Sequence, residues 1–432
     1  MRRHRHVCLC RGFLAFALAY RALGCSGEVV AEPAAAAAVG SGGSAGHGGD
    51  STASVTGGGG AAGDGGTPAF DGPYLVLGEA HSCARRSAGE LYCWGYGLEG
   101  ALGDGSGQNH LVPTKIENAG LVTEVALSAM DTCELRADGV VLCWGANEHG
   151  EVGSCTTADP YQTPAEVVGF SGSAVASVGM GGYHACALLA SGAVACWGLN
   201  SVSQLGLGDV GWLESCEATP VPGLSGVAQL AVGYLHNCAL RGEDATVWCW
   251  GDNQFGAIGL GTPSPSVKQP TLVPGLGDVE RIWAGGTISC ARRAGGELLC
   301  WGANQSGQLG IDTGGSPVLS PTTMPWADGL LELSLGGLHS CGRFADGTTR
   351  CWGDNESGEL GIEGVASASS PTAVPELPEV AAVVAGWGNR TCATSLLGDT
   401  WCWGSNGYGQ LGDGTTENQP TPTPIVIPGA SQ

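Results

Sequence analysis

The tripeptide Cys-Trp-Gly recurs along this chain at an almost constant interval, and no other feature constrains the fold as strongly. Successive copies are 50, 53, 53, 51, 51 and 51 residues apart. A fixed period of this length indicates an array of similar structural units, as in solenoids and propellers. The seven copies begin at Cys93, Cys143, Cys196, Cys249, Cys300, Cys351 and Cys402.

Each unit consists of short segments bounded by turn residues. Apolar runs such as VAQLAVG (227–233) alternate with Gly-rich turns such as GANQSGQLG (302–310), and no stretch of ten residues has a helical period. The segments TCELR and VLCWG flank Ala137-Asp138-Gly139, which predicts a hairpin with Gly139 in a left-handed turn position. About four short strands per unit are typical of a propeller blade.

The repeat resembles that of the regulator of chromosome condensation family. Its pattern here is G-x-x-H-x-C-A-L, then Asp-Gly, then CWG-x-N-x-x-G-Q-L-G, and it is clearest at 182–200 and 336–361. The resemblance covers 74–427 and implies an all-β, seven-bladed propeller spanning 73–432. Because YLVLG (74–78) and TPIVI (423–427) look like the two parts of one divided unit, we expect the N- and C-terminal strands to pair and close the ring.

Each Cys-Trp-Gly is preceded by a second cysteine, ten residues earlier in six units and eleven in the fourth. In a hairpin with a three-residue loop such residues face each other at a distance that suits a disulfide. Metal ligation and free buried thiols are the alternatives. The expected bridges are Cys83–Cys93, Cys133–Cys143, Cys186–Cys196, Cys238–Cys249, Cys290–Cys300, Cys341–Cys351 and Cys392–Cys402, with Cys155–Cys216 between neighbouring units.

Three further residue sets recur with the repeat, and we expect structural roles for them. The seven tripeptide Trp lie opposite mostly small residues, which predicts packing between blades. A His two residues before the first cysteine occurs in four units, where Asp131, Ile288 and Arg390 occupy the other three. A position that tolerates Ile is a poor metal ligand, so we expect the histidines to be buried and hydrogen-bonded. The Asn residues after the tripeptide suit Asx-turns.

The N-terminal 72 residues differ in composition from the repeats. Residues 1–25 have a basic start, a short apolar stretch and Gly24-Cys25, which together predict an export signal in which Cys25 is lipidated, or else an ordinary signal peptide. In 26–72, Gly, Ala and Ser account for 31 of 47 residues, which predicts a flexible linker. We therefore expect an exported protein, at the cell envelope as an outer-membrane lipoprotein or secreted.

Charge and motifs limit the possible functions. Removal of 1–24 leaves 12 basic residues against 40 acidic ones, which argues against nucleic-acid binding. The sequence lacks an H-E-x-x-H motif and a P-loop. We therefore predict no catalytic residues, no cofactor and no metal, and a monomer that binds another protein.

The binding residues are expected where the repeat varies, in the turn after each tripeptide Trp, because ring symmetry places these turns on one rim. Alternatives are guanine-nucleotide exchange, the activity the resemblance implies, and an unrecognised hydrolase or carbohydrate-binding activity. The candidate rim residues are Tyr96, Glu99, Glu148, His149, Gln254, Phe255, Gln305, Glu356 and Tyr408.

Overall fold

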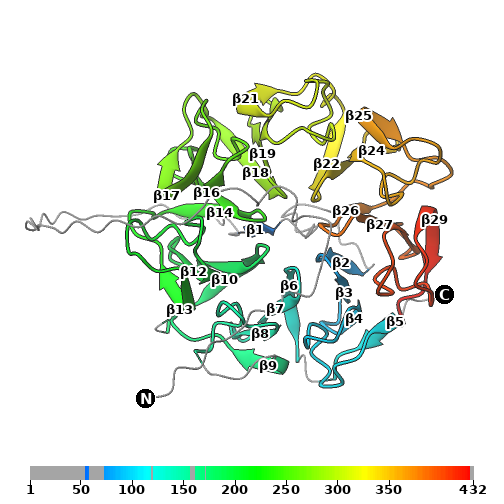
Figure 1. The fold of residues 1–432 in the computed structure, drawn as a ribbon, viewed down its shortest axis with the longest axis horizontal. Coiled ribbons are helices and arrows are strands. Elements are labelled where there is room, and N and C mark those ends of the chain that lie inside the picture. The colour runs from blue at the N-terminus through cyan, green and yellow to red at the C-terminus, as the bar shows by residue number, and fades with distance from the viewer. Residues whose placement is uncertain (1–53, 58–72, 118–119, 156–160, 171, 429–432) are drawn as a thin grey trace, which may run out of the picture. The chain divides into compact units, whose positions relative to one another are not determined.

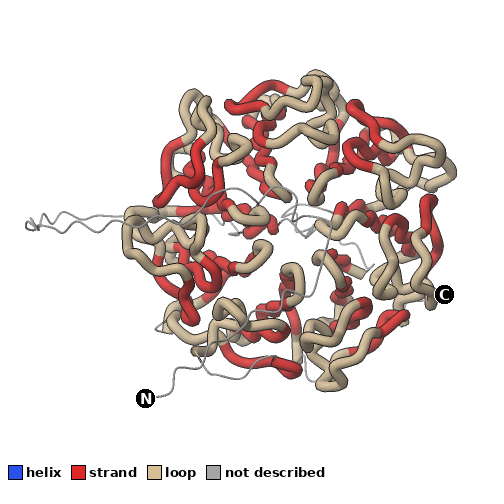
Figure 2. Tube along the Cα trace, in the orientation of Figure 1, coloured by secondary structure: helices blue, strands red, loops and turns tan. Residues whose placement is uncertain are grey.

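A computed structural model of the protein describes residues 54–57, 73–117, 120–155, 161–170 and 172–428. The chain divides into two compact units, 1–50 and 51–432, and every described residue lies in the second. Strands and loops make up the described part of this unit (Figure 2). Accordingly, no helix there is long and apolar enough to cross a membrane.

The strands after residue 73 form seven antiparallel sheets, each from four consecutive strands. Blade 1 contains β2 (Tyr74–Leu77), β3 (His81–Arg85), β4 (Leu91–Gly95) and β5 (His110–Lys115). Blade 2 contains β6 (Val122–Leu127), β7 (Asp131–Arg136), β8 (Val141–Gly145) and β9 (Tyr161–Glu166). Blade 3 contains β10 (Val175–Met180), β11 (His184–Leu189), β12 (Val194–Leu199) and β13 (Glu214–Pro220). Blade 4 contains β14 (Val227–Val232), β15 (His236–Arg241), β16 (Val247–Asn253) and β17 (Ser264–Leu272).

The remaining three blades have the same strand order. Blade 5 contains β18 (Val279–Gly285), β19 (Ile288–Arg293), β20 (Leu298–Gly302) and β21 (Val318–Thr323). Blade 6 contains β22 (Leu330–Leu335), β23 (His339–Phe344), β24 (Thr349–Asp354) and β25 (Ser367–Ala373). Blade 7 contains β26 (Ala382–Ala385), β27 (Arg390–Thr394), β28 (Thr400–Gly404) and β29 (Gln419–Ile425).

The seven sheets are the blades of a propeller, which confirms the predicted fold. The first strand of every blade lies nearest the central channel and the fourth lies at the periphery (Figure 1). We call the four strands of a blade A to D, from the centre outward. A further strand, β1 (Ser54–Gly57), pairs in parallel with β14, the A strand of blade 4.

The predicted mode of ring closure is wrong. Strand β29 pairs with β28 inside blade 7, and β2 pairs with β3 inside blade 1, so no blade is shared between the two ends. Each blade is one contiguous A-to-D unit, because the repeat begins with the apolar run before the cysteine hairpin. Closure depends on packing instead, with Leu77 and Trp94 of blade 1 clustered with Val384 and Leu411 of blade 7.

All eight predicted disulfides are present. Within each blade the two cysteines lie directly opposite each other on strands B and C, with Cα atoms 4.1 Å apart. In blade 4 the extra hairpin residue is absorbed in the turn, where Ala245 adopts a φ of 52°. Gly139 has a φ of 82°, as the hairpin in blade 2 requires. Cys155–Cys216 links the loop between β8 and β9 of blade 2 to strand β13 of blade 3.

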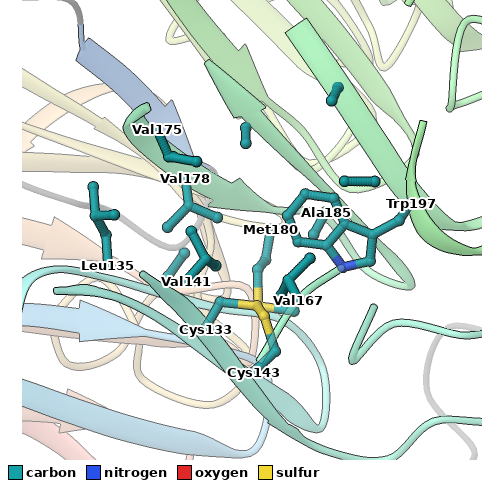
Figure 3. Packing of buried hydrophobic residues seen from close by; sticks show 14 of the residues in the cluster. Cys133, Leu135, Val141, Cys143, Val167, Val175, Val178, Met180, Ala185 and Trp197 are labelled. Atoms are coloured by element: carbon teal, nitrogen blue, oxygen red, sulfur yellow. A yellow bond between two sulfur atoms is a disulfide. The ribbon is translucent and has the colours of Figure 1, made fainter. Parts of the chain in front are cut away.

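The hydrophobic core is divided into seven layers, one at each junction between neighbouring blades. At the junction of blades 2 and 3, Trp197 and Met180 pack against the Cys133–Cys143 bridge and Val167 (Figure 3). The repeat Trp side chains are at most 1% exposed. Their predicted role as packing residues between blades is therefore confirmed.

A shared hydrogen-bond acceptor accompanies this packing. The indole Nε1 of Trp144 donates to the carbonyl oxygen of Ala101 in blade 1 at 2.9 Å, and Thr132 Oγ1 donates to the same oxygen at 2.8 Å. Thr132 is the residue directly across from Trp144. Corresponding pairs bind Gln410 in blade 7, Gln204 in blade 3, Ala257 in blade 4, Gln308 in blade 5 and Glu359 in blade 6.

The four repeat histidines belong to the same junctions and are buried, as predicted. The Nε2 atoms of His81, His236 and His339 lie 2.8–2.9 Å from the hydroxyls of Thr132, Ser289 and Thr391 in the next blade. His184 Nε2 lies 3.0 Å from Asn237 Oδ1. Burial lowers the pKa of His81, His236 and His339 to about 3 and that of His184 to about 4.

Replacing Trp403 with Phe should destabilise the protein by about 1–3 kcal/mol, because the Glu359 carbonyl loses one of its donors and the junction loses volume. Trp401→Phe is the matched control, since Trp401 is on the same strand and is only partly buried. Denaturant unfolding measures both changes. Equal losses in the two variants would contradict a special role for the junction Trp.

The buried histidines should make the protein acid-sensitive. Each has a folded-state pKa below its unfolded value, so its contribution to stability is complete above about pH 6.5 and is lost as the pH falls toward 3. The free energy of unfolding should fall by up to ~1.4 kcal/mol per pH unit for each histidine. His339→Gln cannot titrate, so its unfolding free energy should depend less steeply on pH between 6 and 4. An unchanged slope would contradict this assignment.

Candidate protein-binding face

Two sets of loops lie at the same end of every blade. Because successive strands are antiparallel, the A–B turns and the C–D loops share one face of the propeller, and the B–C hairpins lie on the other. In blade 1 the Tyr96 amide, at the start of the C–D loop, donates to the Ala80 carbonyl in the A–B turn at 3.0 Å. Equivalent bonds occur in the other six blades. We call these two faces the loop face and the hairpin face.

The C–D loops are held in one conformation by their own side chains. Asn304 Oδ1 accepts the amide of Leu309 at 2.9 Å, and Gln308 Oε1 accepts the amide of Ser306 at 3.0 Å. The Asn bond recurs in blades 2 to 7 and spans five residues, so it closes a wider loop than the predicted Asx-turn. The loop side chains between the Asn and the Gln therefore project from a backbone that is fixed by these hydrogen bonds.

The structure places eight of the nine candidate rim residues at the surface of the loop face. Glu148, Gln254, Gln305 and Glu356 are exposed, and Glu99, His149, Phe255 and Tyr408 are half-buried. Tyr96 differs, because its side chain is only 5% exposed. Its ring packs edge-on against Tyr408 of blade 7, with ring centroids 5.2 Å apart. Tyr96 therefore stabilises the seam between the first and last blades and does not reach solvent as expected.

An aromatic chain across the channel mouth is the main feature that the sequence analysis missed. It runs from His149 to Tyr183, Tyr234 and Trp387, with centroid separations of 6.2, 6.1 and 5.4 Å. These residues come from blades 2, 3, 4 and 7, so side chains far apart in sequence meet at the centre of the loop face. Tyr183 is 38% exposed and presents its ring to solvent. The A–B turns GGYH, GYLH and GWGN already contained this signal as aromatic departures from the repeat.

A buried arginine supports this mouth where blade 7 meets blade 1. Arg390 occupies the His position of blade 7 and is fully buried. It donates to the carbonyl of Glu79 at 2.8 Å, to Ser82 Oγ at 3.1 Å and to the carbonyl of His81. Burial lowers the pKa of Arg390 to about 9, so the guanidinium is charged at neutral pH.

Glu79 connects this seam to the aromatic chain. Its carboxylate lies 3.5 Å from the hydroxyl of Tyr234, which reaches across from blade 4. Burial raises the pKa of Glu79, while the Tyr234 hydroxyl and the positive charge of Arg390 lower it. Tyr234 also contacts Trp387 of blade 7, so one side chain joins opposite parts of the ring at the mouth.

The basic residues are distributed unequally between the two faces, whereas acidic residues occur on both. The basic residues at the hairpin face are Arg85, Arg86, Lys115, Arg136, Arg241, Arg281, Arg292, Arg293, Arg343 and Arg350. In contrast, Lys268, ion-paired with Asp209, and the buried Arg390 lie toward the loop face. The C–D loops carry Glu99, Asp104, Glu148, Asp209, Asp312, Glu356, Glu363, Asp413 and Glu417, together with Glu151 and Glu359, which are buried and whose pKa burial raises.

The loop face therefore combines a negative electrostatic potential with an aromatic centre. Such a surface attracts cationic groups, both through its carboxylates and through the faces of its aromatic rings. Within the described residues, no group of three or more His, Cys, Asp or Glu side chains is arranged to hold a metal ion.

Comparisons with known proteins agree with this architecture. Two models of the regulator of chromosome condensation (RCC1) repeat match the chain, one at 88–133, 138–188, 244–292 and 398–431 and the other at 175–204, 227–257 and 281–308. The mitochondrial RCC1 domain-containing protein RUG3 of Arabidopsis thaliana is 33% identical over 251 residues, which is 55% of each chain. The chain thus spans about half the length of that relative.

Two further similarities extend over more of the chain. The ultraviolet-B receptor UVR8 of Arabidopsis thaliana is 28% identical over 360 residues, covering 81% of this chain and 80% of the receptor. The crystal structure of Prp20 from Saccharomyces cerevisiae superimposes with a TM-score of 0.71 at 24% identity, covering 78% of this chain and 86% of Prp20. The structural similarity to Prp20 supports the fold alone.

Proposed function

We propose that this chain, which belongs to the regulator of chromosome condensation (RCC1) repeat family, is a non-catalytic scaffold that binds a basic protein partner through its loop face. The observation that carries the proposal is the exposed Tyr183 in an aromatic chain, inside a ring of acidic loops. Aromatic side chains at the centre of a rigid surface are common binding hot spots.

Rigidity also favours a binding role. The C–D loops are held by their Asn side chains and by a Gln or Glu such as Gln308 or Glu359, whose carboxylate accepts the Ser357 amide at 2.8 Å. The C–D loop of blade 2 is also joined to strand β13 of blade 3 by Cys155–Cys216. A surface that is ordered before binding loses little conformational entropy in the complex. The structurally similar Prp20 binds other proteins, namely Gsp1p and histones.

Tyr183→Ala should weaken binding of the partner at least tenfold, because it removes an exposed ring of the aromatic chain. The partner is first captured with the wild-type protein from envelope and culture fractions, and its Kd is then measured by calorimetry. Neutralising Glu99, Glu148 and Glu356 to Gln should also weaken binding and reduce its dependence on salt.

A matched control neutralises three exposed acids away from the loop face, in the substitutions Glu243→Gln, Asp328→Asn and Glu379→Gln. This variant has the same net charge as the loop-face variant and should bind the partner normally. Binding that is lost in the control and kept in the loop-face variant would refute the proposed face. Substrate turnover abolished by a single rim substitution would refute the non-catalytic role.

We further propose that the propeller is exported and held at the cell envelope through Cys25. Eight disulfides fit an oxidising compartment. The basic and apolar order of residues 1–25 has the form of a signal peptide. Residues 1–25 and most of the expected linker at 26–72 lie outside the described residues, so this proposal rests on sequence for the anchor and on the disulfides for the compartment.

Cys25→Ser should release the protein from the membrane fraction into the soluble exported fraction, because the acyl chain has no other attachment site. Membrane association of the wild type is measured by fractionation and by incorporation of labelled palmitate. Mass spectrometry before and after reduction should give a gain of two hydrogens for each of the eight bridges. A cytosolic protein with reduced cysteines would overturn the proposal.

A further inference from the structure

The innermost strands of neighbouring blades are joined by polar side chains. Glu124 of β6 accepts the Val178 amide of β10 at 3.1 Å. Gln229 of β14 accepts the Ile282 amide of β18 at 2.9 Å and donates to the Ile282 carbonyl at 3.0 Å. Glu332 of β22 accepts the Val383 amide of β26 at 3.4 Å. These side chains satisfy backbone groups on the channel edge of the next A strand, which would otherwise lack a partner in the sheet.

A bulge precedes each of these bridging side chains. The strand register shifts between Val122 and Glu124, between Val227 and Gln229, and between Leu330 and Glu332. A bulge re-aims the following side chain relative to a regular strand. The bridge is therefore a repeated feature of the A strands, with its donor or acceptor at one fixed position in each of these blades.

Blade 3 has the same bulge but not the bridge. The register of β10 shifts between Val175 and Ser177, which places Ser177 at the bridging position. At this position Ser177 does not bridge to the next strand as Glu124 and Gln229 do. Its side chain is 3% exposed, and its hydroxyl has no hydrogen-bond partner. The equivalent backbone position on β14 is Leu230, which stands where Val178, Ile282 and Val383 stand in their own blades.

Strand β1 lies at this unbridged edge. It pairs in parallel with β14, with Val55 opposite Leu230 and Gly57 opposite Val232. It also contacts β10 and β18, the A strands on either side. The strand comes from the segment 26–72 that composition marks as a linker. An extended backbone thus replaces the missing side-chain bridge.

We propose that the channel edge of β14 is a strand-acceptor site for extended polypeptide backbone, and that the chain's own segment Ser54–Gly57 is its occupant. Because Ser177 makes no bridge, the backbone of Leu230 is left available to pair with an added strand. Main-chain pairing supplies the affinity, as in other cases where a peptide adds a strand to a sheet edge. Residues 54–57 are thereby attached to the innermost strand of blade 4. This inference does not depend on the loop-face proposal.

Ser177→Gln tests the site, because it restores the amide that Gln229 provides at the next junction. Hydrogen–deuterium exchange is measured by mass spectrometry on the full chain. In the wild type the amides of 54–57 should exchange at least about tenfold more slowly than in an unfolded peptide. In Ser177→Gln this protection should be lost, because the added side chain takes the place of β1.

Ala382→Gln is the control, since Ala382 pairs with Thr394 as Ser177 pairs with Leu188, and its strand β26 contacts β2 and β22. It should leave the protection of 54–57 unchanged. Val55→Pro provides a second test that leaves the propeller sequence intact, because proline has no amide to pair. It should speed exchange in the peptide covering Val227–Val232.

Circular dichroism and Trp fluorescence check that each variant is folded. Amides of 54–57 that exchange in the wild type as fast as in urea would overturn the proposal. Equal loss of protection in Ser177→Gln and Ala382→Gln would overturn the role of Ser177. If Ser177→Gln does not fold, faster exchange of Val227–Val232 in Val55→Pro supports the site and unchanged exchange refutes it.

Discussion

The junction between neighbouring blades is the interaction on which this structure depends. A single loop carbonyl, such as that of Gln308, accepts the indole N–H of the next blade's Trp and the hydroxyl of the small residue beside it. Because the indole ring is buried away from water, both hydrogen bonds form in a low-dielectric environment. An unpaired carbonyl there would lower the stability of the fold. The same carbonyl belongs to a C–D loop, so one contact joins the blades and holds the loop face in place.

Disulfides and junctions stabilise different parts of the molecule. Each hairpin bridge joins strands B and C of one blade and, in the chain-entropy model, contributes about 3 kcal/mol by restricting the unfolded chain. It does not join one blade to the next. That task falls to the Trp layers and, at the last junction, to Arg390 with its bonds to blade 1. Arg390 closes a ring that no shared strand closes.

The candidate site could be predicted from the sequence in part. The turns after each Trp were expected on one rim because period and symmetry require it, and Glu148 and Gln305 are exposed there. The prediction that Tyr96 is exposed was wrong because Tyr96 lies where the first and last blades meet. Its neighbour there, Tyr408, is more than 300 residues away in the chain. Tyr183, Tyr234 and Trp387 were overlooked because their meeting depends on the diameter of the closed channel, which no local pattern contains.

By itself, the sequence determined the period, the hairpins and their disulfides, and the burial of the repeat Trp and His, because each follows from spacing within one unit. Tertiary structure decided how the ring closes, which side chains meet at the channel mouth and why β14 has an open edge. These features join residues from different blades, so they depend on the geometry of the whole ring. Ser177 shows the difference. In the sequence it is an ordinary serine in a strand, and only its position next to Leu230 of the neighbouring blade connects it to the pairing of β14 with β1.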